Sequence, residues 1–203
     1  MPFAESGAVN NMWHSFDYGL VHFVSISTET DFVGAPEGPG TYLNAGPFGD
    51  QIGWLVRDLQ RAVANRAAVP WIVVAGHRPL YSLGGFNAAL RELLEPLLLK
   101  FQVDLYFSGH VHWYERLFPV INGNVIQRDY NDPASPVYIV NGAGGNIEGP
   151  AKGGNVTEPT AYLNKVNFGF GQLSIESASQ ATWRFFRADT GAVDDQITLV
   201  KRR

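Results

Sequence analysis

The sequence predicts a mixed α/β fold, and three observations support this. The apolar runs Leu20–Ile26, Trp71–Ala75 and Val103–Phe107 have the composition of buried strands. The stretches between them carry apolar residues at helical spacing, so strands and helices alternate along the chain. That order is typical of parallel strands joined by helical crossovers. At 203 residues, the chain has the length of one domain.

The first half of the chain supplies these alternating elements. Trp13–Phe16 and Leu20–Ile26 are expected to form a hairpin around the turn tripeptide Asp17-Tyr18-Gly19. Asp50–Asn65 is predicted as an amphipathic helix with Asp50 as its N-cap. Asn87 is expected to cap a second helix, which has a stripe of leucines on its buried face.

Beyond Arg116 the pattern changes to short strands. Asn122-Gly123 is a typical hairpin turn, and residues 149–166 are expected to form a flexible loop. The Gly-rich stretch 141–146 lacks a phosphate-loop pattern and is interpreted as a tight loop near the site. The predicted strands are Val137–Val140, Phe168–Glu176, Ala181–Ala188 and Gln196–Val200.

Composition and charge exclude several classes of protein. The net charge is −4, the pI is near 5.7, and no Lys/Arg cluster occurs, so nucleic acid is not an expected partner. No apolar run is long enough to span a bilayer, so no membrane partner is expected. The chain has no cysteine, and nothing in the sequence determines the oligomeric state.

Histidines follow two of the predicted strands directly. Gly76-His77 ends one strand, and Gly109-His110-Val111-His112 ends another. In extended backbone, residues two apart point to the same side, so His110 and His112 are expected to converge. Imidazole nitrogens suit zinc, iron or manganese, which makes His77, His110 and His112 candidate metal ligands. Structural histidines at strand ends are the alternative.

Other polar residues are interpreted as structural. His14 and His22 lie before and within a strand, away from the Gly-His segments. The loop after the strand at 20–26 carries Glu29, Asp31 and Glu37. These acids are expected to be solvated loop charges rather than a metal site.

The segments AGHRPLYS (75–82) and SGHVHWYER (108–116) together resemble the metallophosphoesterases, and within them the purple acid phosphatases. Three flanking segments are similar to fungal or bacterial secreted members: SFDYGLVHFVSISTETDF, YIVNGAGGNIEG and NFGFGQLSI. The resemblance implies a four-layer α/β/β/α sandwich and a secreted protein. The family's GDxxY and GNH segments are absent, so residues 1–203 are expected to be the C-terminal part of a single catalytic domain.

The resemblance also implies a function. A dinuclear centre, Fe(III) with Zn(II), Fe(II) or Mn(II), would hydrolyse phosphate monoesters by in-line attack of a metal-bound hydroxide. His112 would ligate the ferric ion, and His77 and His110 the divalent ion. The alternatives are an inactive fragment or a remnant that binds one metal weakly. A serine hydrolase using Ser82 or Ser108 lacks the nucleophile-elbow pattern.

Further residues are candidates for supporting roles. Tyr114, Glu115 and Arg116 follow the histidines and could orient them, or could simply anchor the strand. Plant members of the family carry additional histidines in the stretch that is Leu83–Asn87 here, which has none, so no catalytic acid is assigned. Asn155-Val156-Thr157 is the only N-glycosylation sequon.

Overall fold

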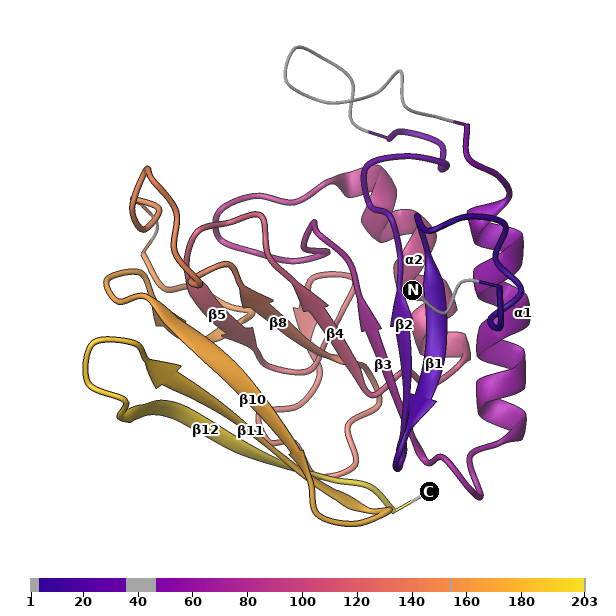
Figure 1. Ribbon diagram of the computed structural model, residues 1–203. Helices are drawn as coiled ribbons and strands as arrows, with labels where there is room; N and C mark the ends of the chain where they lie inside the picture. The colour runs from indigo at the N-terminus through magenta and orange to yellow at the C-terminus, as the bar shows by residue number, and fades with distance from the viewer. Residues whose placement is uncertain (1–3, 36–46, 154, 203) are drawn as a thin grey trace.

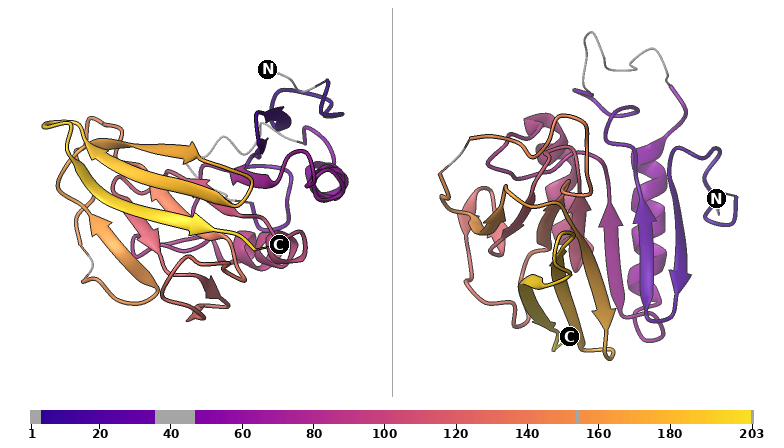
Figure 2. Two further views of the ribbon diagram at one scale, coloured as in Figure 1. Left: turned by 90° about the horizontal axis from the view of Figure 1, so that it is seen from below. Right: turned by 60° about the vertical axis from the view of Figure 1, so that its left-hand side comes forward.

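The computed structural model describes residues 4–35, 47–153 and 155–202. These residues form three layers, with two helices on one face of a seven-stranded sheet and a three-stranded sheet on the other (Figure 1). The view from below shows the small sheet, coloured orange to yellow, stacked over the large one (Figure 2). The predicted mixed α/β class is confirmed. No helix in the described part of the chain is both long and apolar enough to cross a bilayer.

The large sheet has a parallel centre with antiparallel edges. Its strand order is β1-β2-β3-β4-β8-β5-β9. Strands β2, β3 and β4 are parallel, as predicted, and β8 is parallel to β4. Strands β1, β5 and β9 are antiparallel to their neighbours. Its strands are β1 (His14–Tyr18), β2 (Val21–Ser25), β3 (Trp71–Ala75), β4 (Leu105–Ser108), β5 (Tyr114–Leu117), β8 (Val137–Asn141) and β9 (Thr160–Asn164).

Both predicted helices form, with the predicted caps. Helix α1 (Gln51–Ala64) begins after Asp50, whose carboxylate accepts a hydrogen bond from the Gly53 N–H. Helix α2 (Ala88–Lys100) begins after Asn87, which accepts from Leu90 N–H. Each cap satisfies a backbone donor that the first helical turn leaves without an intrahelical partner.

Two apolar cores join the layers, because alternate strand residues point to opposite faces. Ile72 and Val74 of β3 pack with the helices, in the core that includes Leu55 and Leu94. Trp71 and Val73 of the same strand pack with the small sheet. The histidine loops therefore lie at the carboxyl ends of the central strands, and both faces of the sheet are buried.

The small sheet consists of β10 (Gly169–Ile175), β11 (Gln180–Arg187) and β12 (Val193–Val200), all antiparallel as predicted. The hairpin at Asn122-Gly123 is also confirmed, with the short strands β6 (Val120–Ile121) and β7 (Asn124–Val125). The prediction of one flexible loop over 149–166 is wrong in part. Strand β9 lies within this range and pairs with β5. Its backbone partners come from a distant segment, so no local sequence pattern predicts this strand.

A buried ion pair connects the two sheets. Arg116 of β5 donates from Nε and Nη2 to both carboxylate oxygens of Asp195 on β12, at 2.6 and 2.8 Å. The Tyr114 hydroxyl donates to the same carboxylate at 2.6 Å. Burial alone would lower the pKa of Arg116, but its hydrogen bonds to Asp195 raise it. Tyr114 and Arg116 therefore anchor β5 to the small sheet.

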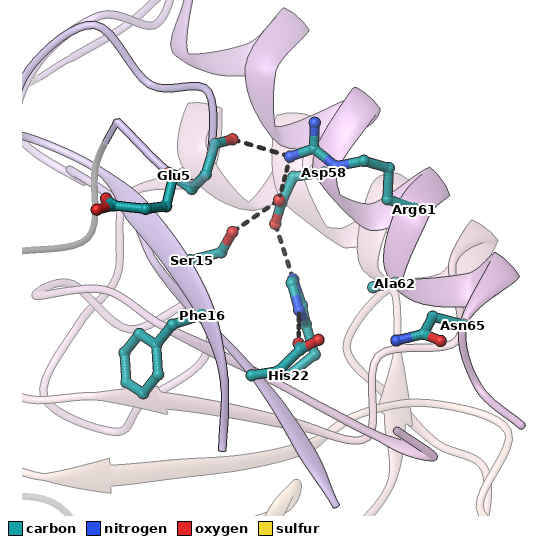
Figure 3. A pocket seen from close by; sticks show the side chains of 10 residues that line it. Glu5, Ser15, Phe16, His22, Asp58, Arg61, Ala62 and Asn65 are labelled. Atoms are coloured by element: carbon teal, nitrogen blue, oxygen red, sulfur yellow. Dashed lines mark hydrogen bonds and ion pairs between the residues drawn. The ribbon is translucent and has the colours of Figure 1, made fainter. Parts of the chain in front are cut away.

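His22 is structural, as its position in a strand indicated. Its Nδ1 lies 2.6 Å from Asp17 Oδ1 and its Nε2 lies 2.9 Å from Asp58 Oδ2 on α1. Only a protonated imidazole can donate from both nitrogens, so this geometry requires the cation. Ser15 and Arg61 also donate to Asp58, at the floor of a surface pocket of about 530 Å³ (Figure 3).

The His22 cluster predicts a pH dependence of stability. Burial lowers the pKa of His22, but the hydrogen bonds to Asp58 and Asp17 outweigh it and raise the pKa above 6.5. Its stabilisation is therefore complete below pH 6.5 and lost as the pH rises through the raised pKa. The pKa of Asp58 is lowered from 3.8: burial opposes this, but the hydrogen bonds from His22 and Ser15 prevail. Its contribution is lost only as the pH falls below that value.

We expect His22→Gln to lower the free energy of unfolding by about 2–3 kcal/mol at pH 5, because two hydrogen bonds to charged groups are lost. The deficit should shrink as the pH rises above the raised pKa of His22. Denaturant unfolding from pH 4 to pH 9 measures both quantities. A deficit that stays constant across this range would contradict a cationic His22.

Candidate metal centre

The structure places two of the predicted histidines at one edge of the large sheet. His77 lies two residues after the end of β3, and His110 lies two residues after the end of β4. Because β3 and β4 are parallel neighbours, both loops leave at the same edge. The Gly109 N–H donates to the His77 carbonyl at 2.9 Å, which ties the loops together. The histidines thus follow two neighbouring parallel strands, and this arrangement brings His77 and His110 together.

His77 and His110 are in contact. His77 Nε2 lies 3.1 Å from His110 Nδ1, and the ring centroids are 4.9 Å apart with the planes at 75°. Two nitrogens held about 2.0–2.1 Å from one ion at tetrahedral angles lie about 3.3 Å apart. The observed separation is close to that value. Both side chains are exposed, so the pair is accessible to an ion from solvent.

Arg78 determines the tautomer of His110. Its Nη1 lies 3.0 Å from His110 Nε2, and a guanidinium can only donate, so Nε2 is the acceptor. In the neutral ring the proton then lies on Nδ1 and is donated to His77 Nε2, so the 3.1 Å contact is a hydrogen bond when no ion is bound. An ion that binds through Nδ1 would displace this proton. Burial lowers the pKa of His110, and the charges of Arg78 and His77 lower it further. The neutral form, which is the form that binds metals, is favoured.

Glu29 holds Arg78 in place. Arg78 Nε and Nη2 donate to the two carboxylate oxygens of Glu29, at 2.8 and 2.9 Å. This two-point contact fixes the plane of the guanidinium. The expectation of solvated loop acids is therefore wrong for Glu29, and also for Asp31, which accepts from two backbone N–H groups. Glu37 lies outside the described residues.

The backbone around His110 is not extended, so the predicted reason for convergence of His110 and His112 is wrong. Val111 N–H donates to Gly109 carbonyl at 2.7 Å, which closes a three-residue turn with His110 at its centre. His110 has φ of +63°, in the left-handed region. Such a conformation costs a non-glycine residue about 1–3 kcal/mol and is concentrated at functional sites. A second short turn, from Trp113 N–H to Val111 carbonyl, follows at once.

No hydrogen bond joins His112 to His77 or His110 within the described residues. Its Nδ1 lies 3.7 Å from Glu148 Oε2, in the loop after β8. Within residues 4–35, 47–153 and 155–202, no group of three or more histidine, aspartate or glutamate side chains is placed to hold a metal ion. The described donors therefore bring together two of the three candidate ligands, His77 and His110.

The segment between the histidines packs into a small core. Val111 is buried with Trp113 and Val140, and Leu83 packs against this cluster. Gly142 packs against this segment, and its N–H donates to the Trp113 carbonyl at 3.0 Å. A Cβ at this position would lie 2.0 Å from the Val111 carbonyl oxygen. Only glycine allows such a close approach of the two backbones.

We expect Gly142→Ala to lower the free energy of unfolding by about 2–3 kcal/mol, because the histidine loop must move to admit the methyl group. Gly144→Ala is a matched control, since its Cβ meets no atom within 4 Å and its φ is not positive. That control should stay within about 0.5 kcal/mol of the wild type. Denaturant unfolding measures both variants, and equal losses would contradict the packing argument.

The remaining predicted residues are also placed. Tyr114, Glu115 and Arg116 are buried, and the first and third bind Asp195, which supports the anchoring interpretation for them. Glu115 accepts hydrogen bonds from the histidine loops and is considered further below. Asn155 is exposed, between β8 and β9.

Neither candidate serine is arranged as a nucleophile. Ser82 Oγ donates to Glu115 at 2.7 Å, and Ser108 Oγ contacts the Ile139 carbonyl oxygen at 3.4 Å. In the described part of the chain, neither hydroxyl has a recorded hydrogen bond to a histidine. The serine hydrolase alternative has no support in this geometry.

The sequence did not identify three neighbours of the histidines, namely Arg78, Glu29 and Glu148. Arg78 and Glu29 are 49 residues apart in the chain, and Glu148 is in a loop without a motif. Arg78 follows His77 directly in the sequence. A cationic residue next to a candidate metal ligand was the one signal in the sequence that could have identified Arg78.

Comparisons with known proteins agree with the resemblance of the motifs. Residues 9–114 match the family model described as calcineurin-like phosphoesterase. Residues 135–196 match the model described as iron/zinc purple acid phosphatase-like protein C. The first match covers β1 to the start of β5, and the second covers β8 to the first half of β12.

The chain is similar to curated fungal enzymes. It is 38% identical to an acid phosphatase of Aspergillus ficuum, over 99% of this chain and 39% of that protein. It is 40% identical to acid phosphatase A of Cryphonectria parasitica, over 93% of this chain and 39% of that protein. The chain thus spans about two fifths of the length of these relatives.

A solved structure supports the fold. The purple acid phosphatase from yellow lupin (Lupinus luteus) seeds superposes with a TM-score of 0.77 at 25% sequence identity, covering 96% of this chain and 34% of that one.

Proposed function

Because this chain belongs to the purple acid phosphatases, within the calcineurin-like phosphoesterases, we propose that it takes part in hydrolysing phosphate monoesters at a dinuclear metal centre. The observation that carries the proposal is the His77–His110 pair, whose nitrogens are spaced for one ion. The family's GDxxY and GNH segments do not occur in this sequence. Residues 1–203 would therefore contribute the histidine side of the centre, as the C-terminal part of one catalytic domain.

The chain's own donors have distinct roles in this proposal. His77 and His110 would hold a divalent ion, zinc, iron(II) or manganese(II), and His112 would hold the ferric ion. The ion-pair contact of His112 is with Glu148, whereas His77 and His110 contact each other, which supports its assignment to a different ion. When bound, the two ions would lower the pKa of a water molecule and neutralise charge on the phosphoryl oxygens.

Residues around the pair would bind and orient the substrate. A pocket of about 320 Å³ opens beside His110, lined also by Arg78, Gly84, Gly85, Phe86 and Asn87. Arg78 is the cationic side chain in this lining, and a guanidinium is well suited to a phosphate. Glu29 keeps it oriented. The lining has no second histidine, so the group that protonates the leaving alcohol is unassigned.

Zinc titration of the purified chain tests the proposal, together with turnover of p-nitrophenyl phosphate. We expect one zinc ion to bind at the pair, with loss of binding in His77→Ala, and no turnover from the chain alone. Absence of zinc binding would contradict the proposed site. Two ions with turnover would show that ligands within this chain complete the centre, contrary to the assignment of a half-site.

We also propose that the protein is secreted, as the resemblance to secreted members implies. The exposed position of Asn155 in the sequon Asn155-Val156-Thr157 supports this, because a glycosylation site must be accessible. Expression through a eukaryotic secretory pathway should add a glycan that a glycosidase removes and that Asn155→Gln lacks. An unmodified secreted chain would contradict use of this site.

A further inference from the structure

Glu115 is a wholly buried carboxylate on β5, with none of its surface exposed. Its strand neighbours Tyr114 and Arg116 point to the small sheet and bind Asp195. Because side chains alternate along a strand, Glu115 points the other way. It therefore faces the loops that carry the histidines.

One carboxylate there accepts hydrogen bonds from three segments of the chain. Oε2 accepts from Ser82 Oγ at 2.7 Å and from Trp113 Nε1 at 3.0 Å. Oε1 accepts from Thr160 Oγ1 at 2.5 Å and from the Leu83 N–H at 3.2 Å. All four donors are neutral. Burying a carboxylate is costly, and several such donors are needed to offset that cost.

Two of these segments are the histidine loops themselves. Ser82 and Leu83 lie in the loop between β3 and α2 that also carries His77, and Trp113 follows His112 directly. The same region is packed closely: a Cβ on Gly84 would lie 2.4 Å from a methyl carbon of Val111, between His110 and His112. Glu115 is thus a polar side-chain connection between the loops, next to the apolar contact of Val111.

We propose that Glu115 is a positioning residue for the metal site: its carboxylate holds the His77 loop against the His110–His112 loop and so maintains the spacing of the two ligand nitrogens. This inference rests on the proposed metal-binding function. Thr160 of β9 donates a further hydrogen bond that holds the carboxylate in place. Glu115 touches neither the ion nor the substrate in this role.

A carboxylate is needed because of the number of donors. Glutamine has the same shape but only one acceptor oxygen, and its NH₂ group can only donate. The Ser82 and Thr160 hydroxyls could reverse their hydrogen bonds, whereas the Leu83 N–H and the indole of Trp113 cannot. Glu115→Gln therefore removes the negative charge that strengthens these hydrogen bonds, and it leaves the Leu83 N–H with only one of its two contacts, at 3.2 Å to Oε1 or 3.3 Å to Oε2.

Zinc affinity is the first readout. We expect Glu115→Gln to weaken zinc binding by about 10-fold or more, the usual effect of losing a group that supports metal ligands. Asp195→Asn is the control, because it disturbs the same strand from its opposite face and touches neither histidine loop. It should bind zinc within about 2-fold of the wild type under conditions where it is folded. Equal affinities in all three proteins would overturn the proposal.

Amide hydrogen exchange without metal is the second readout. The Gly109 N–H bonds to the His77 carbonyl and reports the contact between the loops. In Glu115→Gln its exchange should accelerate relative to the amides of β3, because the loops open locally. In Asp195→Asn both sets should accelerate together, through loss of global stability. An unchanged ratio in Glu115→Gln would overturn the positioning role.

The two readouts separate the possible failures. If the wild-type chain binds no zinc, the proposed function fails, and the exchange ratio still decides whether Glu115 holds the loops together. If the ratio changes but zinc affinity does not, the loops are linked by Glu115 without consequence for the metal. That outcome also overturns the proposal.

Discussion

Replacing His110 with asparagine is expected to lower the affinity of the chain for zinc by more than about 100-fold, because one of the two nitrogens that fit a single ion is lost. Asparagine is the informative substitution. His110 has φ of +63°, and asparagine tolerates the left-handed region better than alanine does. The backbone turn can therefore persist while the imidazole is removed. Isothermal titration measures the affinity, and circular dichroism checks the fold.

His112→Asn is the matched comparison, with the same substitution two residues along the same loop. Since His112 lies beside Glu148 rather than in the pair, we expect its loss to change zinc affinity by less than about 5-fold, which is under 1 kcal/mol. Similar large losses in both variants would mean that all three histidines ligate one ion. A small loss in His110→Asn would remove the pair as the site.

Replacing Asp195 with asparagine is expected to lower the free energy of unfolding by about 3–5 kcal/mol. The substitution leaves the buried guanidinium of Arg116 without a countercharge, although the shape of the side chain is kept. Tyr114 also loses its charged acceptor. Burial first, and then the negative charge and hydrogen bond of Asp195, raise the pKa of Tyr114, so its hydroxyl stays protonated and donating.

Denaturant unfolding measures this loss, with Asp189→Asn as control. Asp189 pairs with Arg187 at 2.5 Å, but the two side chains are 51% and 33% exposed. Water screens the charges of an exposed pair, so the control should be nearly neutral. Arg116→Met combined with Asp195→Leu should recover most of the stability, since removing both charges removes the desolvation cost. Equal losses for Asp195→Asn and Asp189→Asn would contradict the role of the buried pair.

Features that depend on neighbours in the sequence could be predicted from the sequence. The apolar runs at β2, β3 and β4, the caps Asp50 and Asn87, and the turn at Asn122-Gly123 are all local patterns, and the structure has each of them. The Gly-His segments could be placed at one sheet edge because parallel neighbours end together. The family also follows from short motifs in the same loops.

Contacts between distant segments were decided only by the tertiary structure. Glu29 binds Arg78, which is 49 residues away in the sequence, because two loops lie side by side. Arg116 binds Asp195, which is 79 residues away, because the small sheet packs on the large one. Strand β9 is a strand only because β5 offers it backbone partners. The turn at His110, with φ of +63°, replaces the extended backbone that would have aligned the side chains of His110 and His112. The sequence by itself therefore determined which side chains reach the site, whereas packing decided which of them touch, since local spacing carries no information about partners dozens of residues away.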